Sequence, residues 1–151
     1  MQKHELDKID RKILNILMVQ AKKPLKEIAE AVFLSIPAVS ARIEKMEREG
    51  YILGYQAEIN PTLMGYGARA FIQLEVPQEK KEQFYQYASS HPQVMECNCV
   101  TGEYSMLLQV CFPSMEDLEH FTGELQQFGK ARTHVVFSTP VRHRGIRVEE
   151  S

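Results

Sequence analysis

The sequence predicts an α+β protein in which a helical N-terminal part precedes a ferredoxin-like βαββαβ part. Apolar residues recur at helical spacing over residues 6–46 and then alternate at a period of two in later stretches. With 151 residues, of which 44% are hydrophobic and 25% are charged, the chain has an ordinary globular composition. One mid-sized domain or two small ones fit this length.

Three helices are expected in the N-terminal part, because each has a start or stop signal. Asp7 suits the N-cap of the first helix, and Asp10 lies three residues on, near the positive end of the helix dipole. Pro24 suits the first turn of a second, short helix. Ser35 is a good N-cap for a third helix, and Gly50 is a good left-handed stop after it.

The outer face of the third helix has the geometry of a recognition helix in a helix-turn-helix. Small residues near its start allow close approach to a groove, and longer basic residues near its end reach phosphates. A plain three-helix bundle with a solvated outer face is the alternative interpretation. The candidate DNA-binding residues are Ser35, Pro37, Ala38, Ser40, Ala41, Arg42, Lys45 and Arg48.

Strands and helices alternate in the second half of the chain. The expected strands are 68–76, 94–100, 104–112 and 131–137, and the expected helices are 79–90 and 114–128. Ser114 and Asp117 are expected to form a capping box, and Gly129 is expected to end that last helix. This order predicts an antiparallel sheet with both helices on one face.

The other face of this sheet is too apolar for a fully solvated surface. It carries Phe71, Leu107 and Val136 among its polar residues. Scattered surface hydrophobic residues are one explanation. We favour the other, which is that a second copy of the sheet covers this face.

Charge and cysteine usage exclude several classes of protein. The net charge is −2, and it divides into +1 over residues 1–60, −4 over residues 61–140 and +1 over residues 141–151, so nucleic acid is expected at the N-terminal part. The apolar runs are too short for a membrane span, and the polar N-terminus is not a secretory signal. Cys97, Cys99 and Cys111 favour a reducing cytosol and structural thiols over disulfides or a metal site.

A long series of spaced positions closely resembles the Lrp/AsnC family of transcriptional regulators. The positions are Leu6-Asp7, Asp10, Ile13-Leu14, Ile28-Ala29, Leu34-Ser35, Val39, Arg42-Ile43, Glu47, Gly50-Tyr51-Ile52, Gly54-Tyr55-Gln56-Ala57, Pro61 and Gly65. The resemblance implies a winged helix-turn-helix that binds double-stranded DNA as a dimer. We expect this domain at 1–54, a linker strand at 55–66, and an effector-binding and oligomerisation domain at 67–151.

The turn from Thr101 to Ser105 is similar to the family's Gly-x-Tyr-Asp turn, which helps to line an amino-acid site between dimers. Ser105 stands where the family has an acid, and a neutral hydroxyl makes a weaker bond to a ligand than a carboxylate does. A tight hairpin turn that uses Gly102 for its backbone freedom is the alternative. The effector-binding candidates are Cys99, Val100, Thr101, Gly102, Glu103, Tyr104, Ser105, Thr133, His134 and Val135.

The resemblance therefore implies a cytoplasmic, nucleoid-associated regulator that an amino acid or a related metabolite modulates. It implies a dimer that assembles into tetramers or octamers, with no cofactor, no metal site and no catalytic residues. Two alternatives stay open. One is an architectural protein that wraps DNA without an effector, and the other is a tetrapyrrole decarboxylase, an enzyme class that resembles the same two-domain chain.

Overall fold

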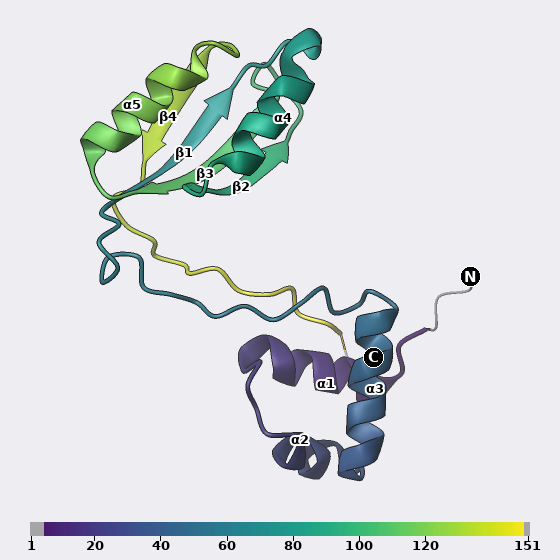
Figure 1. Ribbon diagram of the computed structural model, residues 1–151. Helices are drawn as coiled ribbons and strands as arrows, with labels where there is room; N and C mark the ends of the chain where they lie inside the picture. The colour runs from purple at the N-terminus through teal and green to yellow at the C-terminus, as the bar shows by residue number, and fades with distance from the viewer. Residues whose placement is uncertain (1–4, 150–151) are drawn as a thin grey trace. The chain divides into compact units, whose positions relative to one another are not determined.

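The computed structural model describes residues 5–149 and divides the chain into two compact units (Figure 1). The N-terminal unit comprises residues 1–58 together with 141–151, and the C-terminal unit comprises residues 59–140. Within the described residues, no helix has the length and apolar character that crossing a bilayer requires. The outermost residues of the expected 1–54 and 67–151 domains, 1–4 and 150–151, lie outside the described part of the chain.

The N-terminal unit contains the three expected helices, α1 (Lys8–Val19), α2 (Leu25–Val32) and α3 (Ile36–Arg48). Their apolar stripes meet in one core, as helical periodicity predicts. The buried residues of this core are Ile13, Leu14, Leu17, Ile28, Ala29, Val32, Val39, Ile43 and Met46.

The helix caps follow the sequence signals. Asp7 accepts a hydrogen bond from the Asp10 N–H at 2.8 Å, and Asp10 accepts one from the Asp7 N–H at 3.2 Å, which makes a reciprocal capping box. Ser35 caps α3 by accepting from the Ala38 N–H at 3.3 Å, and Gly50 follows that helix at φ +76°. Pro24 differs from the prediction by one position, because it is the N-cap of α2 and not part of its first turn.

The turn from α2 to α3 contains a feature that the sequence does not signal. Phe33 ends α2 in the left-handed region at φ 56°, although it is not a glycine, and its side chain is 90% exposed. A bulky residue in this region carries backbone strain. The helix-turn-helix geometry therefore holds Phe33 in a conformation that its own side chain disfavours.

The C-terminal unit is a four-stranded antiparallel sheet with helices α4 (Lys81–Ser90) and α5 (Met115–Leu125) on one face (Figure 1). The sheet order is β2-β3-β1-β4, which confirms the βαββαβ fold. A short 3₁₀ helix, Gln78–Lys80, precedes α4. The strands are β1 (Ala68–Leu74), β2 (Val94–Cys99), β3 (Met106–Phe112) and β4 (Ala131–Val135).

Two details of α5 differ from the prediction. The helix ends at Leu125 and not at Gly129, because residues 126–128 continue in tighter turns with i→i+3 hydrogen bonds. Gly129 instead lies at a close backbone approach, where a Cβ would lie 1.7 Å from the carbonyl oxygen of Glu75. Ser114 caps the helix by accepting from the Asp117 N–H at 3.1 Å. The Asp117 carboxylate accepts from the Ser114 hydroxyl at 2.6 Å, where a capping box would have it accept from the backbone.

The segments that flank the C-terminal unit also differ from the prediction. The expected linker strand at 55–66 is not a strand in this chain, because residues 52–60 pair with no neighbouring strand. Asn60 then accepts hydrogen bonds from the backbone N–H groups of Thr62 and Leu63, which turns the chain. The C-terminal unit ends at Pro140 and not at 151, because residues 141–151 belong to the N-terminal unit.

Candidate DNA-binding surface and effector site

A cluster of three charged side chains holds α3 against the start of α1. The Arg42 guanidinium lies 2.7 Å from Asp7 Oδ2 and 2.6 Å from Asp10 Oδ1. The Asp10 side chain is only 4% exposed, whereas that of Arg42 is 30% exposed. The cluster therefore pairs an almost fully buried carboxylate with a cation that comes from another helix.

The pKa values of Arg42 and Asp7 follow from these contacts. Hydrogen bonds to the carboxylates of Asp10 and Asp7 raise the pKa of Arg42 above its ordinary value. Burial by itself would raise the pKa of Asp7, but the Asp10 N–H and the Arg42 guanidinium lower it below its ordinary value. Arg42 and Asp7 therefore both stay ionised at neutral pH.

This cluster changes the expected role of Arg42. Its position on the third helix predicts that Arg42 binds DNA, but in the structure its guanidinium pairs with the carboxylates of Asp7 and Asp10. Its strongest contacts are therefore structural. The sequence could not show this, because Arg42 and Asp10 are 32 positions apart.

The other candidates lie along the outer side of α3. Pro37 and Ala41 are exposed and small, and Arg48 is exposed near the end of the helix. Lys45 is half-buried. Within residues 5–149, the side chains of Lys45 and Arg48 form no hydrogen bond or ion pair, so their charges are available to a partner. Ser40 instead donates its hydroxyl to Glu44 at 3.0 Å.

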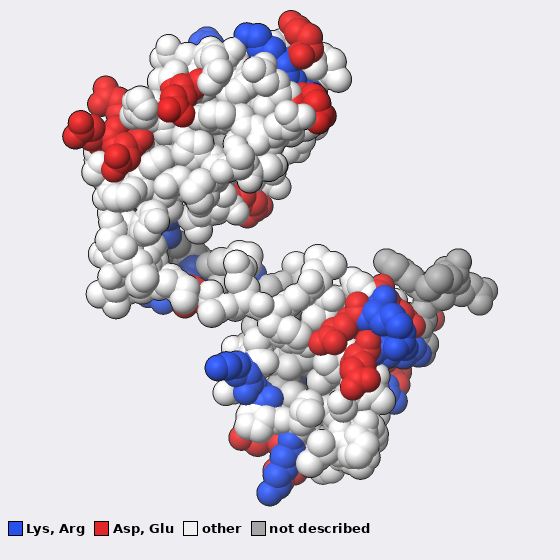
Figure 2. Space-filling model, viewed as in Figure 1, with Lys and Arg blue, Asp and Glu red and all other residues white. Residues whose placement is uncertain are grey.

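The two units differ in charge. The N-terminal unit, with its tail, carries 13 Lys and Arg against 11 Asp and Glu, a net +2, and the C-terminal unit carries 5 against 9, a net −4. Figure 2 shows acidic side chains at several places on the visible face of the C-terminal unit. A polyanion such as DNA is therefore repelled less by the N-terminal unit than by the other.

The expected effector turn joins β2 to β3. The Val100 N–H donates to the carbonyl of Ser105 at 2.8 Å, which closes the turn, and Gly102 has a φ of +115°. Only glycine adopts this backbone conformation readily. The hairpin alternative and the effector alternative are both compatible with this geometry.

Tyr104 is the one side chain of this turn that is buried, with 8% of its surface exposed. Its hydroxyl is buried without a hydrogen-bond partner in the part of the chain that the structure describes. The Arg132 guanidinium of β4 lies 5.2 Å from the centre of its ring. Sequence reasoning missed Arg132, because nothing near it in the sequence signals a contact with Tyr104.

Ser105, at the position of the family's acid, is used within the fold. Its hydroxyl accepts from the Val76 N–H at 3.3 Å and lies 3.4 Å from the Val76 carbonyl, just after the end of β1. The hydroxyl therefore completes backbone hydrogen bonds where the strand ends. Val76 was not among the expected site residues.

The three candidates from β4 do not share one side of the sheet. Thr133 faces α5, where its hydroxyl lies 3.3 Å from that of Thr122. His134 is on the opposite face, 3.4 Å from the Gln73 side chain. Because neighbouring strand residues point to opposite faces, Thr133 and Val135 lie on the helix side of the sheet. Of the two hollows described below, one is lined by none of the ten candidates and the other by Cys99 alone.

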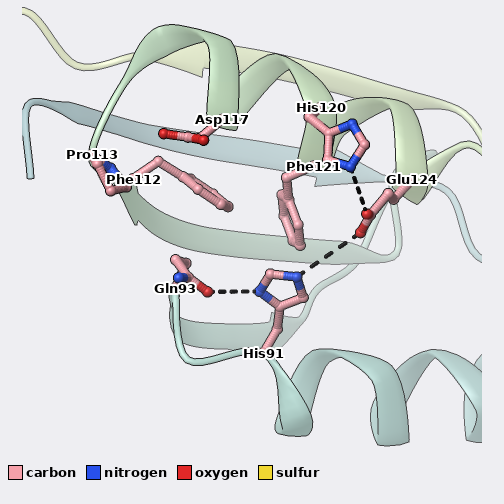
Figure 3. Close-up of a pocket in the computed structure, with 8 residues that line it drawn as sticks. All are labelled: His91, Gln93, Phe112, Pro113, Asp117, His120, Phe121 and Glu124. Atoms are coloured by element: carbon pink, nitrogen blue, oxygen red, sulfur yellow. Dashed lines mark hydrogen bonds and ion pairs between the residues drawn. The ribbon is translucent and has the colours of Figure 1, made fainter.

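A hollow of 190 Å³ lies at the other end of the sheet from this turn (Figure 3). Glu124 is one of its lining residues, with its Oε1 3.1 Å from His120 Nε2 and its Oε2 3.9 Å from His91 Nε2. The Tyr87 phenol also donates to Glu124, and burial together with this carboxylate raises the pKa of Tyr87. None of the expected effector residues lines this hollow.

A second hollow of 440 Å³ lies beside α4 and β2, and Cys97 and Cys99 are among its lining residues. Burial and the neighbouring Cys99 raise the pKa of the Cys97 thiol. Among residues 5–149, no three His, Cys, Asp or Glu side chains are grouped as metal ligands would be.

A helix-turn-helix unit with free cations on its third helix, followed by a separate α+β unit, defines a class of two-domain DNA-binding regulators. Residues 6–52 match the family model for winged helix-turn-helix DNA-binding domains, and residues 69–146 match the model for the Lrp/AsnC ligand-binding domain. The chain belongs to the Lrp/AsnC family of transcriptional regulators.

Relatives and solved structures agree with this assignment. The HTH-type transcriptional regulator FL11 of Pyrococcus horikoshii is 33% identical over 89% of this chain and 91% of its own length. The leucine-responsive regulatory protein of Klebsiella pneumoniae is 30% identical over 87% and 85%. A Neisseria meningitidis transcriptional regulator, solved in complex with L-Met, superimposes with a TM-score of 0.85 at 29% identity, over 93% of this chain and 94% of its own.

Proposed function

We propose that the outer face of α3 is the surface with which this regulator reads double-stranded DNA. The observation that carries the proposal is that some side chains of α3 contact the rest of the unit while others are left for a partner. Arg42 anchors the helix internally, while the small residues Ala38 and Ala41 leave room for a groove. Lys45 and Arg48 have charges that pair with no other residue in the described range 5–149. Ser35, Pro37 and Ser40 complete the proposed surface.

Substitution of the two free cations tests this surface. Lys45→Ala and Arg48→Ala should each weaken binding to a DNA duplex and reduce the salt dependence of log K by about 0.9 for each phosphate that the protein no longer neutralises. Lys130→Ala, an exposed cation in the C-terminal unit, is the matched control. If all three variants bind like the wild type in fluorescence anisotropy, α3 is not the interface.

We also propose that an amino acid or a related metabolite regulates the protein at the 99–105 turn. The buried, unpartnered hydroxyl of Tyr104 supports this, because a buried polar group without a partner is costly and a ligand would satisfy it. The L-Met complex of the Neisseria relative supports the same ligand class. Since the Ser105 hydroxyl is hydrogen-bonded to the Val76 backbone, we expect a ligand that binds without a carboxylate at this position.

Thermal-shift screening with the amino acids tests the sensor proposal, since a ligand that binds only the folded state raises its stability. Tyr104→Phe should reduce the shift that an active ligand produces. Ser105→Asp, which restores the family's acid, should change ligand affinity or assembly and leave the N-terminal unit's DNA contacts intact. The proposal fails if no amino acid alters melting, assembly or DNA affinity in the wild type or in Ser105→Asp.

The exposed sheet face supports a third part of the proposal, which is a dimer with facing sheets that assembles further into tetramers or octamers. Phe71 is 40% exposed on this face, and Leu107 and Val136 lie on it half-buried, while both helices cover the other side. Leu107→Glu would place a charge in such an interface and should dissociate it. A monomeric wild type in sedimentation velocity, or an unchanged oligomer for Leu107→Glu, would contradict the dimer.

The two alternative functions have separate tests. An architectural DNA-wrapping protein would bind a specific duplex and competitor DNA about equally, whereas a sequence-specific regulator would prefer one of them. A tetrapyrrole decarboxylase would purify with, or bind, a tetrapyrrole that absorbs visible light. We propose the regulator, acting in the cytoplasm on the nucleoid, because α3 keeps its free cations and the named relatives are regulators.

A further inference from the structure

Residues 145–149, near the C-terminal end of the described chain, dock on α1 of the N-terminal unit. The Asn15 side-chain amide donates to the Val148 carbonyl at 2.8 Å, and its oxygen accepts from the Val148 N–H at 3.1 Å. Arg11 donates to the carbonyl of Glu149 at 3.1 Å. Two side chains of α1 therefore bind the tail through its backbone, much as a neighbouring strand would.

Packing supports the same docking. Val148 packs against the core of the N-terminal unit. At Gly145 the tail backbone passes so close to α1 that a Cβ would lie 2.9 Å from the Met18 sulfur. Arg11, Asn15 and Met18 are spaced by four and three residues, so they share one face of α1. This face is the docking site of the tail.

The docked tail carries three cations that the protein itself does not use. Arg142, Arg144 and Arg147 are exposed, and none of their side chains forms a hydrogen bond or an ion pair with any other described residue. Arg42 and Arg11, in contrast, are both engaged within the unit. We call Arg142, Arg144 and Arg147 the tail strip.

We propose that the tail strip is a second DNA-binding element, which contacts the phosphate backbone alongside the surface of α3. This inference rests on DNA binding by the N-terminal unit and extends the interface to residues from the other end of the chain. In an extended chain the strip spans about 17 Å, which matches roughly five base-pair steps of ~3.4 Å along a duplex. Arginine is suited to bidentate contacts with phosphate.

Docking explains how the strip would contribute to affinity. A free tail would lose conformational entropy when it bound DNA, whereas the docked residues 145–149 already hold Arg147 on α1. Arg142 and Arg144 come just before this docked segment, so only a short span is left to be ordered on binding. The charges of the strip also belong to the unit with a net +2 and not to the unit with a net −4. The strip therefore adds positive charge to the unit that carries the proposed DNA surface.

The first test replaces the tail strip with glutamine in the full-length protein, as Arg142→Gln, Arg144→Gln and Arg147→Gln combined. The probe is a random-sequence duplex, because phosphate contacts do not depend on sequence. Affinity in fluorescence anisotropy at 0.1 M salt should fall about tenfold or more, and the slope of log K against log salt should decrease by about 0.9 for each phosphate left without its arginine.

The matched control removes the same charge from the C-terminal unit, as Lys80→Gln, Lys81→Gln and Lys130→Gln combined. This control should lose much less affinity than the tail variant. Equal losses would mean that only net charge matters, and would overturn the proposal. A tail variant that binds DNA like the wild type but changes the oligomer in sedimentation would also overturn it, and would assign the strip to a protein contact.

A third variant separates docking from charge. Asn15→Ala removes both hydrogen bonds to Val148 and leaves all charges in place, so it should weaken DNA binding by a part of the loss seen for the tail variant. Wild-type affinity in Asn15→Ala would overturn the role of docking. If Lys45→Ala weakens binding and the tail variant does not, the tail inference fails while DNA binding by α3 stands.

Discussion

The two units of this protein are held together in different ways. The N-terminal unit joins its first and third helices through a buried carboxylate, Asp10, and a guanidinium, Arg42, beside a small apolar core. The C-terminal unit packs a larger apolar core between one sheet face and two helices, with backbone contacts as close as that of Gly129 with Glu75. The N-terminal unit is therefore more sensitive to changes of charge, and the C-terminal unit to changes of shape.

The largest expected effect is a loss of stability when a methyl group is added to the tightly packed C-terminal unit. Gly129→Ala should destabilise this unit by about 3 kcal/mol, because its methyl group would overlap the backbone of Glu75 and force apart the two segments that meet just after β1. Gly123→Ala is the control: it lies inside α5 with nothing within 4 Å of a new Cβ, and it should stabilise by about 0.5–1 kcal/mol. Urea unfolding followed by circular dichroism measures both, and similar effects at the two glycines would contradict the contrast.

The next largest effect is a loss of stability when a charge is removed from the N-terminal unit. Arg42→Ala should destabilise this unit by about 2 kcal/mol, because it removes the cation that pairs with the buried Asp10. Arg48→Ala, on the same helix but exposed, should change stability by less than about 0.5 kcal/mol. Hydrogen exchange of the α1 and α3 amides reports on this unit alone. Equal protection in the two variants would show that the cluster does not hold the helices together.

A smaller effect, of opposite sign, is expected at the turn between α2 and α3. Phe33→Gly should stabilise the N-terminal unit by up to about 1 kcal/mol, because glycine adopts the left-handed conformation without strain. The exposed ring loses its contact with the Lys12 ammonium, 5.8 Å from the ring centre, which offsets part of this gain. The measurement is the same hydrogen exchange. A loss of stability would mean that the Phe33 ring contributes more than its backbone strain costs.

The smallest effect is the pH dependence that comes from Asp7. Its pKa is lower in the folded protein than its ordinary value of 3.8, so its ionised form stabilises the fold above that pH. This contribution is lost as the pH falls below 3.8. The difference in stability between wild type and Asp7→Asn should therefore be constant above about pH 5 and should narrow in acid. A difference that does not narrow would mean that Asp7 acts without its charge.

Local signals predicted those features that depend on residues a few positions apart. The caps at Asp7 and Ser35 are visible in the sequence, because a cap bonds a backbone group only two or three residues away. The order of strands and helices follows from periodicity for the same reason. Periodicity does not locate the ends of strands: β1 stops at Leu74 and not at 76, since a strand ends where the hydrogen bonds to its partner strand end.

The contacts that give particular residues their roles lie beyond such local signals. Arg42 has the side chain and the position on α3 that are typical of a DNA-binding residue, and only the folded chain brings it to Asp10. Tyr104 meets Arg132 across the sheet, and Asn15 meets Val148 across 133 positions of sequence. Periodicity and capping describe how a segment folds on itself, whereas these pairings depend on how distant segments pack, which no single segment encodes.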